Sequence, residues 1–202
     1  MTRERSAPTD AAIDRDDVTE TPLDALRAQA AADPALPPFV RKLLAEGAPL
    51  EAIRLDAYGR WWHEGHPIDH PRVRALFHRS LARTEAGTWV LRVPPYTYPV
   101  LVDDVGHFVV RLIRDADGWS TVSSTGQREP LDPTTWMTDG DAWIGVRIHD
   151  GRDPARLVGA AHQTALDAID ADEDGWFVAL DGDDGDVARI GPRTPDREGR
   201  ES

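Results

Sequence analysis

The feature that most constrains the fold is the stretch from residue 53 to residue 93, where the spacing of apolar residues changes twice. Residues 53–55 alternate between apolar and polar side chains, which is typical of a half-buried strand, and residues 61–63 predict a return strand. Apolar residues then recur at helical spacing. Residues 89–93, with the sequence Trp-Val-Leu-Arg-Val, predict a third strand. We therefore expect the order strand, strand, helix, strand.

The helix in this unit has a defined start. Pro71 is expected at the first helical position, where its missing N–H costs nothing, and Asp69 or His70 is expected to cap the helix. Gly87 predicts its end. The apolar stripe is predicted to contain Val73, Leu76, Phe77 and Leu81.

The second half of the chain follows a related plan. Residues 96–102 and 108–112 alternate and predict a hairpin. A second helix is expected to start at Asp153-Pro154 and to end near Ile169. We therefore expect an α+β fold of two similar motifs, each a small, mainly antiparallel sheet packed by one helix. Further strands are predicted at residues 119–123, 143–149 and 176–180.

The two ends of the chain are polar and lack periodicity, so both are predicted to be disordered. Two short helices, Pro22–Ala32 and Phe39–Glu46, are predicted before the body and are too short to be stable alone. The predicted division is 1–21 as a disordered N-terminal tail, 22–50 as a short helical segment, 51–115 as the first α/β motif, 116–181 as the second α/β motif and 182–202 as a disordered C-terminal tail.

Composition excludes several classes of function. A formal net charge of −13 repels phosphate backbones and anionic lipids, so we expect no nucleic-acid or membrane partner. The absence of cysteine excludes disulfides, thiolate metal ligands and a cysteine nucleophile. We expect a cytoplasmic protein, because no signal peptide and no run of roughly 20 apolar residues is present. A nucleophile elbow, a phosphate-binding glycine loop and a nucleotide fingerprint are also missing.

Five short motifs carry a family resemblance: residues 53–56, 59–68, 73–77, 89–102 and, more loosely, 143–147. They resemble the bacterial domain-of-unknown-function family 1285, over roughly residues 52–180. The resemblance implies repeated sheet-plus-helix motifs and no established activity, with a role in signal transduction suggested. This chain has Asp69-His70 where the family tends to have Gly-Arg, and Tyr96-Thr97 where a Glu-Lys pair is usual. A different ligand is therefore expected if those positions bind one.

Polar side chains gather just before the first predicted helix. His63, His66, Asp69 and His70 lie close together in the sequence, and imidazole and carboxylate groups can bind a transition metal. A metal-assisted hydrolase that uses His63, His66 and Asp69 is therefore one alternative function. The other interpretation is a histidine on a strand face followed by a helix cap.

The first predicted helix also carries a basic face, on which Arg72 and Arg79 are joined by Arg83. In so acidic a chain this face can meet an anionic ligand or an acidic partner, or it can be a solvated polar face. Tyr96, beside the proline pair, is expected to line a groove. The candidate ligand-binding residues are therefore His63, His66, Asp69, His70, Arg72, Arg79 and Tyr96.

An acidic segment near the end of the second motif has the spacing of a calcium loop. Asp170, Asp172 and Asp174 alternate, Gly175 follows, and Asp181 occupies the twelfth position. That position usually holds Glu, and the intervening residues predict a strand, so a solvated connecting loop is the other interpretation. Calcium is the one cofactor that the sequence suggests, and calcium-modulated binding is a second alternative function.

The sequence as a whole favours a binding or regulatory module without catalytic activity. Its partner is expected to be a small ligand or another protein, neither of which the motifs identify.

Overall fold

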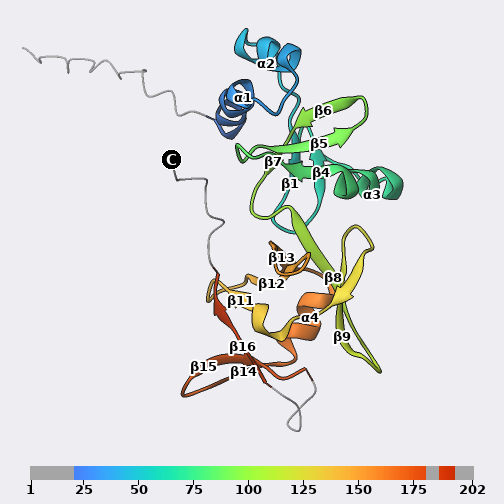
Figure 1. The fold of residues 1–202 in the computed structure, drawn as a ribbon, viewed down its shortest axis with the longest axis vertical. Coiled ribbons are helices and arrows are strands. Elements are labelled where there is room, and N and C mark those ends of the chain that lie inside the picture. The colour runs from blue at the N-terminus through green and yellow to red at the C-terminus, as the bar shows by residue number, and fades with distance from the viewer. Residues whose placement is uncertain (1–20, 181–186, 194–202) are drawn as a thin grey trace, which may run out of the picture.

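The computed structural model describes residues 21–180 and 187–193. The described chain is a mixed α+β protein, as predicted, with short helices, small sheets and mainly antiparallel strands (Figure 1). The disorder predicted for residues 1–20, 182–186 and 194–202 lies outside the described residues. Within them, no helix combines the length and the apolar character that crossing a membrane requires.

The two short helices predicted before the body are confirmed as α1 (Pro22–Ala32) and α2 (Pro38–Ala45). The Thr21 hydroxyl caps α1 by accepting a hydrogen bond of 3.2 Å from the backbone N–H of Asp24. Neither helix is long enough to be stable in isolation, so their apolar side chains pack onto the adjacent sheet. The cluster that they form contains Leu26, Ala30, Leu36, Leu44, Leu50 and Val90.

The predicted helix after residue 70 is confirmed as α3 (Pro71–Ser80), but the prediction that it extends to Gly87 is wrong. Residues 81–83 form the strand β4 (Leu81–Arg83) instead, because pairing with Leu91 buries Leu81. Gly87 has a φ of 88° and lies in the turn after β4. Glycine adopts this left-handed backbone without steric cost.

The predicted apolar stripe of α3 is only partly buried. Phe77 packs edge-on against Trp61, with ring centroids 5.2 Å apart. Leu76, in contrast, keeps 39% of its surface exposed. His70 occupies the N-cap position but makes no side-chain capping bond, so its predicted capping role is wrong. The helix is therefore anchored mainly through Phe77.

The first half contains two small sheets (Figure 1). One is antiparallel and has the order β4-β5-β6, and α3 lies near its central strand. The other has the order β3-β2-β1-β7. Their strands are β1 (Ile53–Leu55), β2 (Trp61–His63), β3 (His66–Pro67), β5 (Trp89–Val93), β6 (Tyr96–Pro99) and β7 (Leu101–Val102).

The hairpin predicted between residues 96–102 and 108–112 is wrong. β6 pairs with β5, and β7 pairs in parallel with β1. The strand β8 (His107–Asp115) leaves the first half and pairs with strands of the second half. Alternation correctly predicts that these segments are strands. It does not identify the partner, because partner and register depend on which face the assembled core buries.

The second half is built on a seven-stranded sheet of order β10-β9-β8-β13-β12-β11-β17. A three-stranded sheet, β14-β15-β16, follows it. β16 and β17 lie where a disordered tail was predicted, so that prediction is wrong for residues 188–192. The elements are β9 (Gly118–Ser123), β10 (Arg128–Pro130), the short 3-10 helix η1 (Pro133–Thr135), β11 (Met137–Thr138), β12 (Ile144–Ile148), β13 (Asp153–Leu157), α4 (Ala160–Leu166), β14 (Ile169–Asp172), β15 (Gly175–Val178), β16 (Ala188–Arg189) and β17 (Gly191–Pro192).

The second helix begins later than predicted, because Asp153-Pro154 opens the strand β13. Ala155 and Leu157 are buried at alternate positions of this strand, which pairs with both β12 and β8. The chain then turns at Gly159, whose φ is 54°, into α4, which packs near β8 through Ala161 and Ala165. The prediction that both helices begin at a proline is therefore wrong, although each half does combine strands with one helix.

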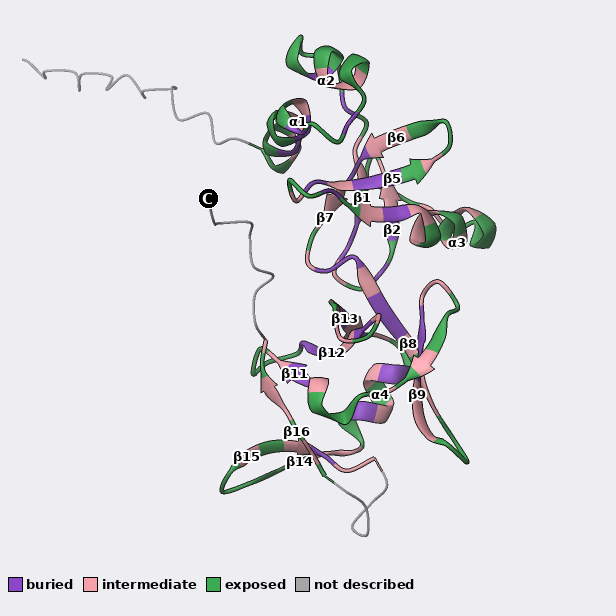
Figure 2. Ribbon diagram, viewed as in Figure 1, coloured by how far each residue is buried: buried purple, intermediate pink, exposed green. Residues whose placement is uncertain are grey.

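Buried segments, purple in Figure 2, occur in both halves, and one buried apolar cluster joins the halves. Leu55 and Trp61 come from the first half, whereas Met137 and Trp143 come from the second. Trp61, Trp136 and Trp143 are buried in the core, whereas Trp176 is 56% exposed. The two halves therefore share apolar contacts.

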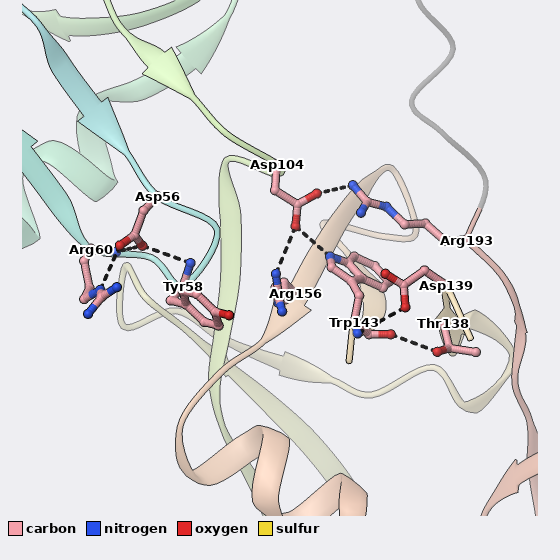
Figure 3. Close-up of polar contacts among 9 residues, drawn as sticks. All are labelled: Asp56, Tyr58, Arg60, Asp104, Thr138, Asp139, Trp143, Arg156 and Arg193. Atoms are coloured by element: carbon pink, nitrogen blue, oxygen red, sulfur yellow. Dashed lines mark hydrogen bonds and ion pairs between the residues drawn. The ribbon is translucent and has the colours of Figure 1, made fainter. Parts of the chain in front are cut away.

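A buried polar network reinforces this contact (Figure 3). Asp104, in the link between β7 and β8, accepts a hydrogen bond of 2.8 Å from the indole Nε1–H of Trp143. Its carboxylate also pairs with Arg156, at 3.4 Å, and with Arg193. The Arg156 guanidinium lies over the ring of Tyr58 in the first half, with Cζ 5.0 Å from the centroid. Asp104 and Arg156 are each only 11% exposed, so solvent screens this pair weakly.

Core packing around β13 predicts a large loss of stability for Leu157→Ala. Leu157 is 1% exposed, so truncation removes buried contacts and leaves a cavity, at a cost of about 2–5 kcal/mol. Leu166→Ala, at a 48% exposed position of α4, is the matched control and should change stability by less than about 1 kcal/mol. Urea unfolding followed by circular dichroism measures both, and equal effects would contradict the assignment of Leu157 to the core.

The Asp104 network predicts a second contrast, between neighbouring aspartates. Asp104→Ala leaves an indole N–H and two guanidinium groups without this acceptor and should lower the free energy of unfolding by about 3 kcal/mol. Asp103 pairs with Arg54, which is about half exposed, so Asp103→Ala should cost less than about 1 kcal/mol. Urea unfolding measures both variants. If Asp103→Ala lowered the free energy of unfolding as much as Asp104→Ala, burial would not explain the contribution of the Asp104 network to stability.

Candidate functional site

A polar cavity of about 380 Å³ lies between the two halves of the chain. Arg83 and Trp89 line it from β4 and β5, and His107 lines it from the start of β8. Arg152 and Asp153 line it from the segment that follows β12. A ligand in this cavity would therefore contact both halves.

Trp89 forms one wall of the cavity because residue 106 is a glycine. A Cβ atom at Gly106 would lie 2.4 Å from Cη2 of the indole, so any other residue would displace the ring. The Arg83 guanidinium lies over the same ring, with Cζ 5.5 Å from its centroid. The ring of His107 meets Trp89 at an interplanar angle of 70°. This wall is therefore both aromatic and cationic.

The turn between β12 and β13, which contributes Arg152 to the cavity, has an unusual backbone. His149 and Asp150 have φ values of 55° and 57°, a left-handed conformation that is uncommon outside glycine. Side chains hold the turn from both sides. The backbone N–H of His149 donates to the carboxylate of Glu129 at 2.9 Å, and Nε of Arg152 donates to the carbonyl of His149 at 2.8 Å. The turn is therefore closely fixed.

This turn brings together two histidines and an aspartate. Nδ1 of His149 lies 2.8 Å from Oδ2 of Asp153, and the rings of His107 and His149 stand nearly perpendicular with centroids 5.1 Å apart. One nitrogen or oxygen atom from each of the three side chains lies within 4.8 Å of the others. Among the described residues this is the one group of three or more His, Asp or Glu side chains with the spacing to hold a metal ion.

A second cavity, of about 270 Å³, lies beside α3 and is lined by Tyr58, Arg74 and His78. The turn that carries Tyr58 is fixed by Asp56, which accepts hydrogen bonds of 2.9 Å from the backbone N–H groups of Tyr58 and Arg60 (Figure 3). Burial would raise the pKa of the Asp56 carboxyl, but these bonds, with those from side chains, lower the pKa below its usual value. The carboxylate therefore stays ionised and holds the turn.

His78, on α3, is largely withdrawn from water. Burial, the positive charge of Arg74 and the nearby His107 together lower the pKa of its imidazole to about 4, while a hydrogen bond with the backbone of Gly59 opposes them. Nδ1 of this ring is buried without a hydrogen-bond partner. The side chain is therefore neutral at physiological pH and behaves as part of the aromatic packing next to Trp61 and Phe108.

The histidines predicted as ligands lie elsewhere. His63 and His66 are opposite each other in the β2–β3 hairpin, so their side chains share one face, and His63 lies 3.3 Å from the carboxylate of Glu51. Asp69 and His70 lie exposed in the loop before α3. Neither of the two cavities above contains these residues. Their role as ligands stays a prediction.

The remaining predicted ligand residues are on the surface. Arg72 and Arg79 are exposed on α3, and Tyr96, at the start of β6, is 74% exposed. Arg83 does not share the helix with them, because it lies in β4. The structure brings only Arg83 of this basic set to the polar cavity.

The acidic segment forms a hairpin. Asp170 and Asp172 lie in β14, and Asp174 lies in the turn to β15. Arg189 donates two hydrogen bonds to Asp172, at 2.6 and 2.7 Å, and lowers the pKa of its carboxyl. A calcium ion would have to compete with this guanidinium. Asp181 lies outside the described residues, and calcium binding stays a prediction.

Sequence patterns did not identify His107, His149 and Asp153 because the three residues belong to separate elements: His107 begins β8, His149 lies in the turn after β12, and Asp153 begins β13. His149 and Asp153 are four residues apart, but Asp153-Pro154 reads as a helix start and so conceals their proximity. Only the pairing of β13 with both β8 and β12 brings His107 to the other two.

No protein-family model matches the chain, and no curated protein matches it. Two solved structures are similar in fold. One, from Shewanella baltica, is 18% identical with a TM-score of 0.43 and covers 53% of this chain and 84% of its own. The other, from Silicibacter pomeroyi, is 17% identical with a TM-score of 0.46 and covers 64% of this chain and 75% of its own.

Both are DUF1285 family proteins. This is the family that the motifs of residues 52–180 resemble. At these identities and TM-scores, nothing about a ligand or a reaction transfers from those proteins to this chain.

The depressed pKa of His78 predicts a defined pH dependence of stability. Between pH 6.5 and about 4 the unfolded chain binds a proton at this residue and the folded chain does not, so stability falls as the pH drops through this window. The loss amounts to about 3 kcal/mol at pH 4.

His78→Phe removes the titrating group and keeps an aromatic ring, so its stability should decline less between pH 7 and pH 4. Urea unfolding at a series of pH values measures the difference. His70→Gln, at an exposed position, is the control and should follow the wild type. Parallel curves for wild type and His78→Phe would contradict a neutral, buried His78.

Proposed function

We propose that this chain is a cytoplasmic binding module without catalytic activity, of the kind used in regulation, and that its ligand is a small anion held in the polar cavity between its two halves. The observation that carries this proposal is the lining of the cavity. In a chain of net charge −13, two arginines, a histidine and an indole ring face a shared space.

The two arginines are anchored in a way that suits an anion. Nε of Arg83 donates to the carbonyl of Gly87 at 3.2 Å, and Nε of Arg152 donates to the carbonyl of His149 at 2.8 Å. These bonds limit how far the guanidinium groups can move. A planar guanidinium presents paired N–H donors that match a carboxylate or a phosphate group. Less conformational entropy is then lost on binding.

The remaining polar groups are compatible with this ligand. Asp153 carries the opposite charge, but its carboxylate is hydrogen-bonded to His149, which reduces its repulsion of an anion. A volume of about 380 Å³ falls within the range of small-molecule sites. Trp89 offers a flat apolar surface for a planar part of the ligand.

A position between the halves supports a regulatory role. A ligand that contacts both halves stabilises the arrangement in which they meet, by an amount set by its concentration relative to its Kd. Binding of the ligand in the cavity can therefore change how strongly the two halves associate.

The proposal predicts anion binding that depends on Arg152. Isothermal titration of EDTA-treated protein with inorganic phosphate, and separately with succinate, should show saturable binding by at least one of them that weakens as salt is added. Arg152→Gln and Arg83→Gln should each weaken it about 10-fold or more, since each removes charge-assisted hydrogen bonds.

Arg79→Gln is the matched control, because Arg79 is exposed on α3 and outside the cavity. The affinity of Arg79→Gln for the anion should equal that of the wild type. Loss of binding in Arg79→Gln with retention in Arg152→Gln would move the anion site to the basic face of α3. Absence of binding by both anions would contradict the proposed ligand class.

A further inference from the structure

We propose that His107, His149 and Asp153 form a binding site for one divalent transition-metal ion of the zinc class in the wall of the polar cavity. The inference rests on the proposed function only in placing the ion in the same cavity. The ion's binding does not require the anion, so the two proposals can fail separately.

The types of ligand atom at the site indicate which class of metal ion it would bind. Two imidazole nitrogens and one carboxylate oxygen suit Zn²⁺ and its neighbours, whereas Ca²⁺ and Mg²⁺ prefer oxygen ligands alone. Bonds of about 2.1 Å in a tetrahedral site place the donor atoms roughly 3.4 Å apart. Since the three donor atoms already lie within 4.8 Å of one another, small side-chain rotations close the site.

The fold holds the three side chains from three directions. His107 begins β8, His149 follows β12, and Asp153 begins β13. β13 pairs in parallel with β8, with Ala155 opposite His107, and pairs antiparallel with β12, with Asp153 opposite Ile148. Backbone pairing therefore sets the positions of His107 and Asp153, and the hydrogen-bonded turn after β12 sets the position of His149.

The hydrogen bond between His149 and Asp153 marks the position that the ion would take. Nδ1 of His149 and Oδ2 of Asp153 are 2.8 Å apart, which is the distance of a shared proton. An ion that binds both atoms takes the place of this proton, which in a neutral imidazole moves to Nε2, because the ligating nitrogen must be unprotonated. Binding should therefore weaken as the pH falls, because protons compete with the ion for the ligand atoms.

Three protein ligands leave one tetrahedral position for a water molecule or a ligand. All three side chains are partly exposed, and His107 and Asp153 line the cavity itself. The open position therefore faces the space that Arg83 and Arg152 also line. An anion bound there would contact the metal as well as the guanidinium groups.

The experiment uses the full chain, stripped with EDTA and free of phosphate, titrated with Zn²⁺ by calorimetry and with Co²⁺ by visible absorption. We expect one Zn²⁺ per chain with micromolar or tighter affinity and a Co²⁺ spectrum of low coordination number. His149→Asn, His107→Gln and Asp153→Asn should each weaken binding by at least about 100-fold.

The variants are chosen to preserve the fold. Asn is among the residues that best tolerate the left-handed backbone of position 149. Circular dichroism and the Tm of the metal-free variants check this, and should one variant fail to fold, the other two decide.

His66→Gln is the matched control, since it removes an exposed imidazole of the predicted cluster, and it should bind zinc as the wild type does. Equal affinity in all four variants would show adventitious binding and overturn the site. Absence of binding to the wild type, or loss in His66→Gln with retention in His149→Asn, would overturn it too. None of these outcomes depends on phosphate, which is tested on metal-free protein.

Discussion

The carboxylate of Asp104 fixes how the two halves of this chain meet. It lies in the link between the halves, and it receives the indole N–H of Trp143 together with Arg156 and Arg193. A buried carboxylate is tolerated only where such partners compensate its lost hydration. The Trp143 ring that it orients then enters the apolar cluster shared by both halves, where Arg193 covers it with Cζ 4.4 Å from the centroid. The hydrogen bond from Trp143 to Asp104 therefore orients an apolar ring for packing between the two halves.

The same two segments carry the restraint and the candidate site. Residues 104–107 run from Asp104 to His107, and residues 153–156 run from Asp153 to Arg156. The segments lie side by side because β13 pairs in parallel with β8, with Ala155 opposite His107 and Arg156 opposite Phe108. Movement of one segment relative to the other would break the ion pair and the spacing of His107 and Asp153 together. The contacts that make the core rigid therefore also hold the polar groups of the cavity in place. Groups that are fixed before a ligand arrives are preorganised for binding.

Local patterns in the sequence predicted much of the secondary structure but less of the assembly. The proline at Pro71 and the alternation in β8 and β12 are local signals, and they gave correct element types. They failed where strand pairing determines the element type. Leu81, for example, fits the helical spacing of the apolar stripe but is buried in the strand β4. Asp153-Pro154 failed for the same reason. The candidate site was missed because its ligands meet only through strand pairing, whereas the predicted cluster of His63 and His66 was close in sequence and remained on the surface.

The backbone of the β12–β13 turn gives an independent reason to regard this region as functional. A turn that only reversed the chain would be served by glycine or asparagine at its left-handed positions, without the cost of about 1–2 kcal/mol that a larger residue incurs there. This turn instead has His149 with a φ of 55°, and that conformation places the imidazole against Asp153 and next to His107. Hydrogen bonds from Arg152 and to Glu129 offset the strain. Local strain that the surrounding structure maintains, at a residue type suited to ligand binding and beside a cavity, supports the hypothesis of a binding site at this turn.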